Sequence, residues 1–245
     1  MSEPSSQPPT AVASDPTSPA QGFALGVVGA AAFAHLLNDL IQATLPAIFP
    51  LLKRDFDLSF GQIGGIALVY QITASLLQPW IGLYTDRHPM PYLLPAGMAV
   101  TFVGIATLAV AHSYPMLLLA AAIVGVGSAT FHPEASRVAR MGSGGRFGTA
   151  QSTFQVGGNT GQAIGPLLAA AVVIPHGQSA VAWLMLVAGL AVFVLLRLTR
   201  WSVQHGQARL ANLAGRRGSG LPRSKVVQAI AVVSVLMFAK FVYIA

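Results

Sequence analysis

The stretch FALGVVGAAAFAHLLNDLIQATLPAIFPLL, from Phe23 to Leu52, decides the fold class, because 30 residues in succession are apolar with few exceptions. A helix of this length can cross a bilayer, even when it is tilted. The polar exceptions are spaced i, i+3, i+4 and i+7, which places them in one stripe along a helix face: His35, Asn38, Asp39 and Gln42. A carboxylate facing lipid is costly, so the stripe is predicted to face a bundle interior or a wet cavity.

The whole chain has the composition of an integral membrane protein. It is 54% hydrophobic and 9% charged, with a mean hydropathy of +0.65, whereas about a quarter of the residues in soluble domains are charged. Cysteine is absent, which excludes disulfides and zinc–thiolate sites. Residues 1–22 are rich in Ser and Pro and contain no Lys or Arg, so they are predicted to be a disordered tail and not a signal peptide.

Seven apolar segments follow one another along the chain. They predict a six-helix transmembrane bundle over 23–198, a flexible cytoplasmic loop over 199–225, and the first helix of a second bundle over 226–245. The segments are Phe23–Leu52, Phe60–Tyr84, Tyr92–Ala111, Pro115–Val138, Phe147–Ile174, Ser179–Leu198 and Val226–Ala245.

The net charge of +7 indicates membrane orientation. With the N-terminus in the cytoplasm, eleven Lys and Arg residues fall in cytoplasmic connectors, and only Lys53 and Arg54 fall outside. This asymmetry follows the positive-inside rule. The sequence therefore predicts a multi-pass protein of the inner membrane with a cytoplasmic N-terminus, and it gives no reason to expect nucleic-acid binding.

A weak internal repeat is also present. The dipeptide Phe-Gly opens segments at residues 60 and 147, and Pro79 and Pro166 follow at the same separation. This pattern predicts two inverted three-helix repeats, and coincidence is the alternative.

Asp39 is the candidate proton carrier. A carboxyl beside a poorly hydrated passage can take up and release a proton in the physiological range. His35, one helical turn earlier, can share that proton or hold the carboxylate. The alternative is a structural cluster that locks this helix to its neighbours, and it stays open above all for His35, Asn38 and Gln42.

A second acidic residue within a span, Glu134, lies three residues before Arg137 on the same helix face. An ion pair between them would either brace the helix or gate the inner mouth. His132 precedes Pro133, which loosens the helix locally. Histidines at 35 and 132 are too few to indicate a metal site, so neither a metal nor another cofactor is expected. Without a nucleophile–base pair or a phosphate loop, an enzyme is not expected either.

The segment 147–174 has two distinct faces. Glycines recur every four residues and predict close helix packing: Gly157, Gly161 and Gly165. About 200° away lies a polar stripe that is predicted to line water: Gln151, Gln155 and Asn159. A polar stripe with i, i+4, i+7 spacing occurs in Phe60–Tyr84, where core packing and cavity lining are both open: Gln71, Ser75 and Gln78.

Two motifs resemble those of the major facilitator superfamily. The run Gly82-Leu83-Tyr84-Thr85-Asp86-Arg87 resembles the G-x-x-x-D-[RK] loop between helices 2 and 3. The basic residues that usually follow are replaced here by His88-Pro89-Met90-Pro91. The run from Gly157 to Pro166 resembles the Gly-rich helix-5 motif, ending in Gly-Pro, of proton-driven antiporters. With this resemblance, a group of residues is expected to gate the inner mouth: Asp86, Arg87, His132, Glu134 and Arg137.

Further stretches resemble the fosmidomycin-resistance branch of that superfamily. They are His35–Asp39, Ser75–Pro79, Phe131–Met141 and Phe154–Asn159, and the similarity covers roughly Phe33 to Trp201. The resemblance implies a twelve-helix transporter with two six-helix halves around a central cavity. It also implies proton-coupled export of small molecules, with the phosphonate fosmidomycin as the namesake substrate.

The chain ends at Ala245, within the seventh segment, so we expect a truncated chain whose missing half is required for transport. The expected partners are protons, a small-molecule substrate and lipid. Lys240 lies at a depth comparable to that of Asp39, and we expect it to pair with Asp39 and to bind an anionic substrate when released. The expected substrate path comprises Asn38, Gln42, Gln71, Gln78, Gln155, Asn159 and Lys240. The alternatives are a metabolite uniporter or symporter, and a truncated membrane remnant without transport activity.

Overall fold

The described part of the chain is helical wherever it has regular structure. The computed structural model describes residues 22–88, 90–215 and 222–244. Within these ranges it contains α, π and 3-10 helices and no strand, which confirms the predicted all-α class. The chain forms two compact units, residues 1–204 and 205–245.

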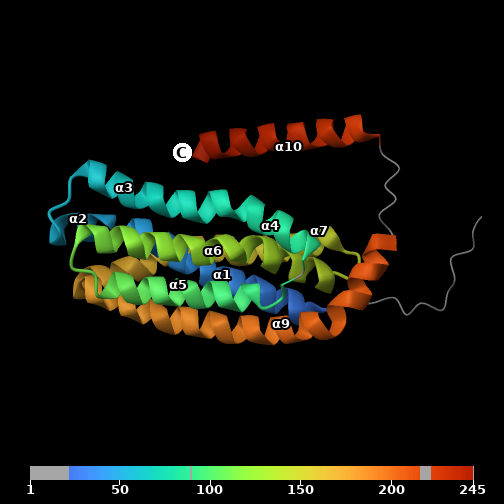
Figure 1. Ribbon diagram of the computed structural model, residues 1–245, viewed down its shortest axis with the longest axis horizontal. Helices are drawn as coiled ribbons and strands as arrows, with labels where there is room; N and C mark the ends of the chain where they lie inside the picture. The colour runs from blue at the N-terminus through green and yellow to red at the C-terminus, as the bar shows by residue number, and fades with distance from the viewer. Residues whose placement is uncertain (1–21, 89, 216–221, 245) are drawn as a thin grey trace, which may run out of the picture. The chain divides into compact units, whose positions relative to one another are not determined.

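The first unit is a bundle of long helices, shown in Figure 1. Two of its spans are interrupted by π-helical turns, η1 and η2, and a 3-10 segment, η3, precedes α9. In chain order the elements are α1 (Leu25–Ala47), α2 (Phe49–Asp55), α3 (Phe60–Gln71), η1 (Ile72–Leu76), α4 (Leu77–Arg87), α5 (Leu93–Ala109), α6 (Tyr114–Gly142), α7 (Phe147–Leu168), η2 (Ala169–Val173), α8 (Ile174–His176), η3 (Gln178–Trp183) and α9 (Leu184–Gly215).

Local sequence signals determine where several helices begin. A capping box starts α3: the Ser59 hydroxyl accepts from the backbone N–H of Gln62, and the Gln62 side chain accepts from the backbone N–H of Ser59. Pro115 lies in the first turn of α6, where its missing N–H costs no helical hydrogen bond. Gly144 and Gly145 have φ angles of 58° and 92°, so the turn between α6 and α7 requires a residue without a side chain.

Several described helices are suited to a membrane by length and composition alone. Four are long and apolar enough to span one: Leu25–Ala47, Phe60–Arg87, Tyr114–Gly142 and Gln178–His205. Two shorter apolar helices, Leu93–Ala109 and Ser224–Leu236, also coincide with predicted segments. The remaining predicted segment contains α7, which is helical but carries many glycines and amides. The inverted-repeat relation between the segments stays a prediction.

Glycines bring α7 against the backbone of α1. At each of three positions an added Cβ would overlap backbone atoms of α1: Gly157 at Ala32, Gly161 at Leu36, and Gly165 at Leu40. The hydroxyl of Thr44 on α1 lies 2.8 Å from the carbonyl of Leu40 in its own helix and 3.2 Å from that of Gly165. The glycines therefore lie where the sequence predicts a packing face, and we call this interface the α1–α7 contact.

A second close approach joins α5 and α6, which run side by side in Figure 1. A Cβ at Gly127 would overlap Thr101 and the backbone of Gly97. One at Gly104 would overlap Val124. This interface, the α5–α6 contact, is the counterpart of the α1–α7 contact on another side of the bundle.

The chain remains helical where the sequence predicts a loop. Because α9 continues to Gly215, the prediction of a flexible loop over 199–225 is wrong for residues 199–215. The run from Gln207 to Ala214 is rich in Ala, Leu, Arg and Gln, whose helix propensity outweighs the composition that suggested a loop. The buried Thr199 also donates to the carbonyl of Pro91 over 3.0 Å, which holds the early part of this stretch to the bundle.

The second unit contains the last turns of α9, from residue 205 on, and α10 (Arg223–Ile244). Its exposed apolar side chains include Val227, Ile230 and Leu236. The side chain of Lys240 lies outside the described residues, so its expected pairing with Asp39 stays a prediction. The predicted disordered tail likewise lies outside them, except for Gly22.

Candidate functional site

The polar stripe of α1 lies in the interior of the first unit. His35, Asn38 and Asp39 are at most 3% exposed, and Gln42 is half-buried. α6 and α7 both pack against this helix. The stripe therefore faces other helices, as the cost of a carboxylate in lipid predicts.

Both oxygens of the Asp39 carboxylate have polar neighbours. Asn38 Nδ2 donates to Oδ1 over 3.0 Å, and Gln162 Nε2 of α7 donates to Oδ2 over 2.9 Å. His35 Nε2 lies 3.4 Å from Oδ2, and His132 Nε2 of α6 lies 4.0 Å from Oδ1. These five residues form the Asp39 cluster, which joins α1, α6 and α7.

The imidazole of His35 is held in one orientation. Its Nδ1 lies 2.8 Å from the backbone carbonyl oxygen of Phe154, which can only accept a hydrogen bond. The Phe154 ring stacks on the imidazole, with centroids 4.0 Å apart and planes inclined by 20°. Gly158, one turn along α7, leaves the necessary space, because a Cβ there would overlap His35 and press on Asp39.

This orientation determines how protons fit between His35 and Asp39. Because Nδ1 must carry the hydrogen donated to Phe154, Nε2 of a neutral His35 presents a lone pair to Asp39. Two acceptors 3.4 Å apart repel one another unless a proton resides on one of them. The pair is therefore arranged to hold one proton, either on the imidazole or on the carboxyl group.

His132 is the most exposed of the three ionisable side chains in the cluster. Its side chain is 31% exposed, compared with 3% for His35 and 4% for Asp39. Its ring meets that of His35 edge-on, with centroids 5.2 Å apart. The sequence places His132 at the inner mouth, whereas the structure places its ring beside Asp39.

The side chains of His35, Asp39 and His132 are close enough together to be considered as a metal site. Their candidate ligand atoms lie within 4.8 Å of one another. Ligands around a tetrahedral ion with metal–nitrogen bonds of about 2.0 Å are only about 3.3 Å apart. Both Asp39 oxygens also accept hydrogen bonds from amides already. This geometry favours a proton-sharing cluster over a metal centre.

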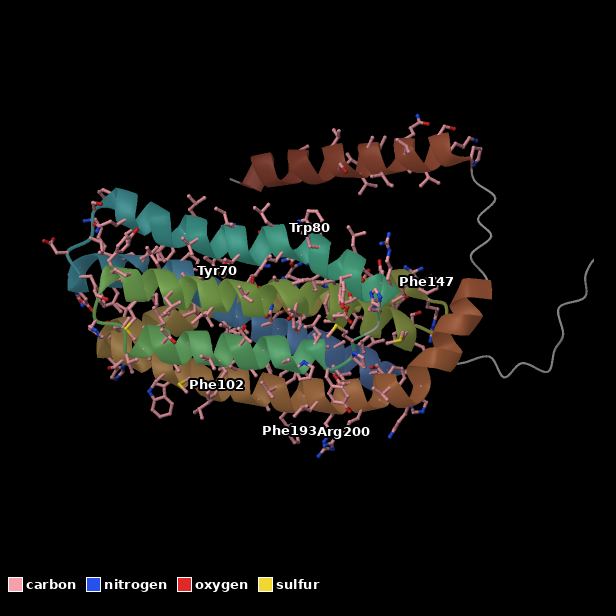
Figure 2. The ribbon with its side chains drawn as sticks, viewed as in Figure 1. Tyr70, Trp80, Phe102, Phe147, Phe193 and Arg200 are labelled. Atoms are coloured by element: carbon pink, nitrogen blue, oxygen red, sulfur yellow. The ribbon has the colours of Figure 1, made fainter. Side chains whose placement is uncertain are left out.

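A second polar contact lies further along α1. The Tyr70 hydroxyl of α3 donates to Gln42 Oε1 over 2.8 Å, while Gln42 Nε2 is buried without a hydrogen-bond partner. In Figure 2, Tyr70 lies on the side of α3 that faces α6, whereas Trp80 points away from the bundle. Gln42 therefore does not belong to the Asp39 cluster, because its hydrogen-bond partner is Tyr70 of α3.

The polar stripe of α7 leads to the cluster. Gln155 and Asn159 are exposed and bonded to each other, with Gln155 Nε2 3.3 Å from Asn159 Oδ1. Gln162 continues their i, i+4, i+7 spacing and contacts Asp39. Gln162 is not among the residues expected from the sequence, although the continued spacing is visible there.

A π-helical turn interrupts the expected polar stripe of the second span. The π-helical turn η1 lies between Gln71 and Gln78 and contains Ser75. A π turn holds one residue more than an α turn, so the face rotates by about 100° across it. Accordingly Gln71 is exposed while Gln78 is half-buried.

A network centred on Arg137 joins α4 to α6 at one end of the bundle. Its guanidinium lies 2.6 Å from Asp86 Oδ1 and 3.5 Å from Glu134 Oε1, and it donates to the Thr85 carbonyl over 2.8 Å. The expected neighbours Glu134 and Arg137 are thus in contact. Arg87 is exposed next to them. Thr85 was not among the expected residues, since a backbone acceptor gives no sequence signal.

Comparisons with known proteins agree with this arrangement. The family described as the Major Facilitator Superfamily matches residues 31–245. The chain is 49% identical over 244 residues to the fosmidomycin resistance protein of Escherichia coli (strain K12), covering 98% of this chain and 58% of that protein. It is 46% identical over 184 residues to an uncharacterized MFS-type transporter, YfnC, of Bacillus subtilis (strain 168), covering 75% of this chain and 44% of that protein. The chain thus spans about half the length of these curated relatives.

Proposed function

The chain belongs to the Major Facilitator Superfamily, and from this premise we propose that the protein exports small molecules in exchange for protons. Members of this family are transporters and not enzymes. The name of the fosmidomycin resistance protein supports a drug of that kind, or a metabolite of similar chemistry, as the exported molecule. Since the chain spans 58% of that relative, the activity is proposed for the protein at its full length.

The main observation in support of this proposal is the His35–Asp39 pair. A proton carrier needs a group that binds one proton in a protected site and has a partner to stabilise the other protonation state. Asp39 is held 3.4 Å from an imidazole nitrogen whose opposite nitrogen is bonded to Phe154. In the proposal Asp39 carries the proton, and a His35 that is protonated at Nε2 stabilises the carboxylate when Asp39 is ionised.

The polar residues expected from the sequence form the proposed substrate path, and of these Asn38 belongs to the Asp39 cluster. Their amides can bond to a polar substrate without adding a fixed charge to the cavity. Lys240 is the expected positive charge for an anionic group such as a phosphonate. The path residues are Asn38, Gln42, Gln71, Gln78, Gln155, Asn159 and Lys240.

The Arg137 network is the proposed inner gate. Arg137 contacts a carboxylate on α4 and another on its own helix, so it can hold α4 and α6 together or be released from Asp86. The exposed Arg87 belongs to the same proposed gate. His132, which the sequence places at this gate, lies in the Asp39 cluster instead. In this proposal the protein lies in the inner membrane. Its N-terminal side faces the cytoplasm, because eleven basic residues fall on that side.

Removal of the Asp39 carboxyl tests the proposal. The protein at full length is reconstituted in liposomes that contain a pH-sensitive dye, and proton movement driven by fosmidomycin is recorded. Asp39→Asn is expected to lower the coupled proton flux at least 100-fold, on the order expected for loss of a positioned acid–base group. Imposing the pH gradient in both directions establishes the direction of coupling.

The matched control is Asp55→Asn, which makes the same chemical change at an aspartate paired with the exposed Arg54. This variant is expected to keep wild-type coupling. Undiminished proton flux in Asp39→Asn would refute the carrier role of Asp39.

A further inference from the structure

The buried position of Asp39 raises the question of how a proton reaches it. The Asp39 side chain is 4% exposed and that of His35 is 3% exposed, so neither exchanges protons freely with water. His132 is 31% exposed and its Nε2 lies 4.0 Å from Asp39 Oδ1. Within the Asp39 cluster, His132 thus combines a solvent-accessible ring with proximity to the carboxylate.

We infer that His132 relays protons between water and Asp39. This inference rests on the proposed function of Asp39 and adds the route by which the carrier is loaded. In the loading step a protonated His132 gives its Nε2 proton to Asp39 Oδ1, which yields a neutral imidazole and a carboxylic acid. The imidazole then takes another proton from water, and unloading runs in reverse. One bridging water or a small ring rotation closes the 4.0 Å gap.

The two oxygens of Asp39 serve different partners in this arrangement. Oδ2 faces His35, whose Nδ1 is bonded to the Phe154 carbonyl, and accepts from Gln162 of α7. Oδ1 accepts from Asn38 and faces His132. The proton therefore enters at Oδ1 without displacing the bond between Gln162 and Oδ2.

The surroundings of His132 suit a relay. Within the described residues, the ionisable groups that act on its ring are Asp39 and His35, both on α1. The groups that α7 brings to the cluster, Phe154 and Gln162, are uncharged. Pro133 directly after His132 removes one helical hydrogen bond and eases local adjustment of the ring.

The rate at which Asp39 gains a proton tests the inference. The protein at full length is purified in detergent, and its infrared carboxyl absorption is followed after a rapid fall in pH. The part of this band that is lost in Asp39→Asn belongs to Asp39. In His132→Ala the band is expected to appear on the order of 100-fold more slowly, with an unchanged final amplitude. Added imidazole is expected to restore the rate, because it replaces the missing ring.

Two further variants make the result decisive. His176→Ala removes an exposed histidine of α8 that is bonded to the Val172 carbonyl of η2, and it is expected to leave the rate unchanged. His132→Gln keeps a polar side chain if the alanine variant does not fold, and it is expected to lose the same rate. A wild-type rate in both His132 variants, or a loss that imidazole does not restore, overturns the relay. Absence of any Asp39 band in the wild type overturns the proposed carrier itself.

Discussion

The α1–α7 and α5–α6 contacts are built alike but enclose different chemistry. In both, glycines allow the backbone of one helix to approach the other, and an added Cβ would overlap the facing helix. The α1–α7 contact encloses the ionisable His35 and Asp39, whereas the α5–α6 contact encloses neutral hydroxyls such as Thr101 and Thr130. Close packing by glycine therefore provides a dry and well-ordered wall. Only the α1–α7 contact is a candidate site, because His35 and Asp39 can gain and lose protons whereas the hydroxyls named at the α5–α6 contact stay neutral.

The largest expected effect comes from breaking either contact. Gly161→Val and Gly127→Val both force a side chain into the facing backbone. Overpacking of this kind is expected to lower the free energy of unfolding by about 3 kcal/mol. Thermal unfolding in detergent measures the loss, and transport is expected to fail in both variants together with the fold.

Gly189→Val is the control for these two substitutions, because a Cβ at Gly189 meets no heavy atom within 4 Å. Its unfolding temperature is expected to match the wild type closely. Equal stability of Gly161→Val and Gly189→Val would contradict the role assigned to the α1–α7 glycines.

A smaller effect, on transport and not on stability, is expected from a substitution at the α1–α7 contact. Gln162→Leu removes the amide that donates to Asp39 Oδ2 over 2.9 Å. A hydrogen bond to a charged group contributes about 2 kcal/mol, so coupled transport is expected to fall roughly 30-fold while the fold is retained. Proton flux in liposomes and thermal unfolding in detergent are measured side by side.

Thr160→Val is the control on the same helix, since Thr160 bonds only the carbonyl of Val156 in α7 among the described contacts. Wild-type transport is expected for this variant. If Gln162→Leu transported as well as Thr160→Val, the contact with Asp39 would have no functional weight.

The smallest effect is expected in the α5–α6 contact. The Thr101 hydroxyl is buried without a hydrogen-bond partner among the described residues. Thr101→Val keeps the shape and removes this unpaired group, so stability is expected to stay the same or rise by up to about 1 kcal/mol. Transport is expected to be unchanged.

Thr130→Val provides the contrast, because its hydroxyl donates to the Gly127 carbonyl over 2.9 Å. It is expected to lose about 1 kcal/mol. Thermal unfolding of the two variants compares them directly, and a greater loss in Thr101→Val would show that its hydroxyl has a partner.

Features set within one helix could be predicted from the sequence. The stripe from His35 to Gln42, the neighbours Glu134 and Arg137, and the glycines of α7 all follow from helical spacing. The helical state of residues 199–215 differs from the prediction, because the helix propensity of Ala, Leu and Arg in this stretch outweighs its polar composition. The rotation of the second span at the π turn η1 could not be predicted, because no sequence rule locates such a turn.

Contacts between helices could not be predicted in the same way. The approach of His132 to Asp39 and of Arg137 to Asp86 depends on how deep each helix lies and how it is rotated. Periodicity fixes the face of a residue on its own helix and says nothing of its partner on another. Gln162 shows the intermediate case, since its spacing was visible but its acceptor was not.

Gly158 has a consequence for how this protein can vary in evolution. Any side chain at position 158 would overlap the His35 imidazole. Substitution of Gly158 is therefore expected to occur only together with substitution of His35 or Asp39. Relatives that retain both are expected to keep glycine there, and a relative with a larger residue is expected to have abandoned the pair. Natural variation at a residue with no chemistry of its own thus reports whether a lineage still handles protons in this way.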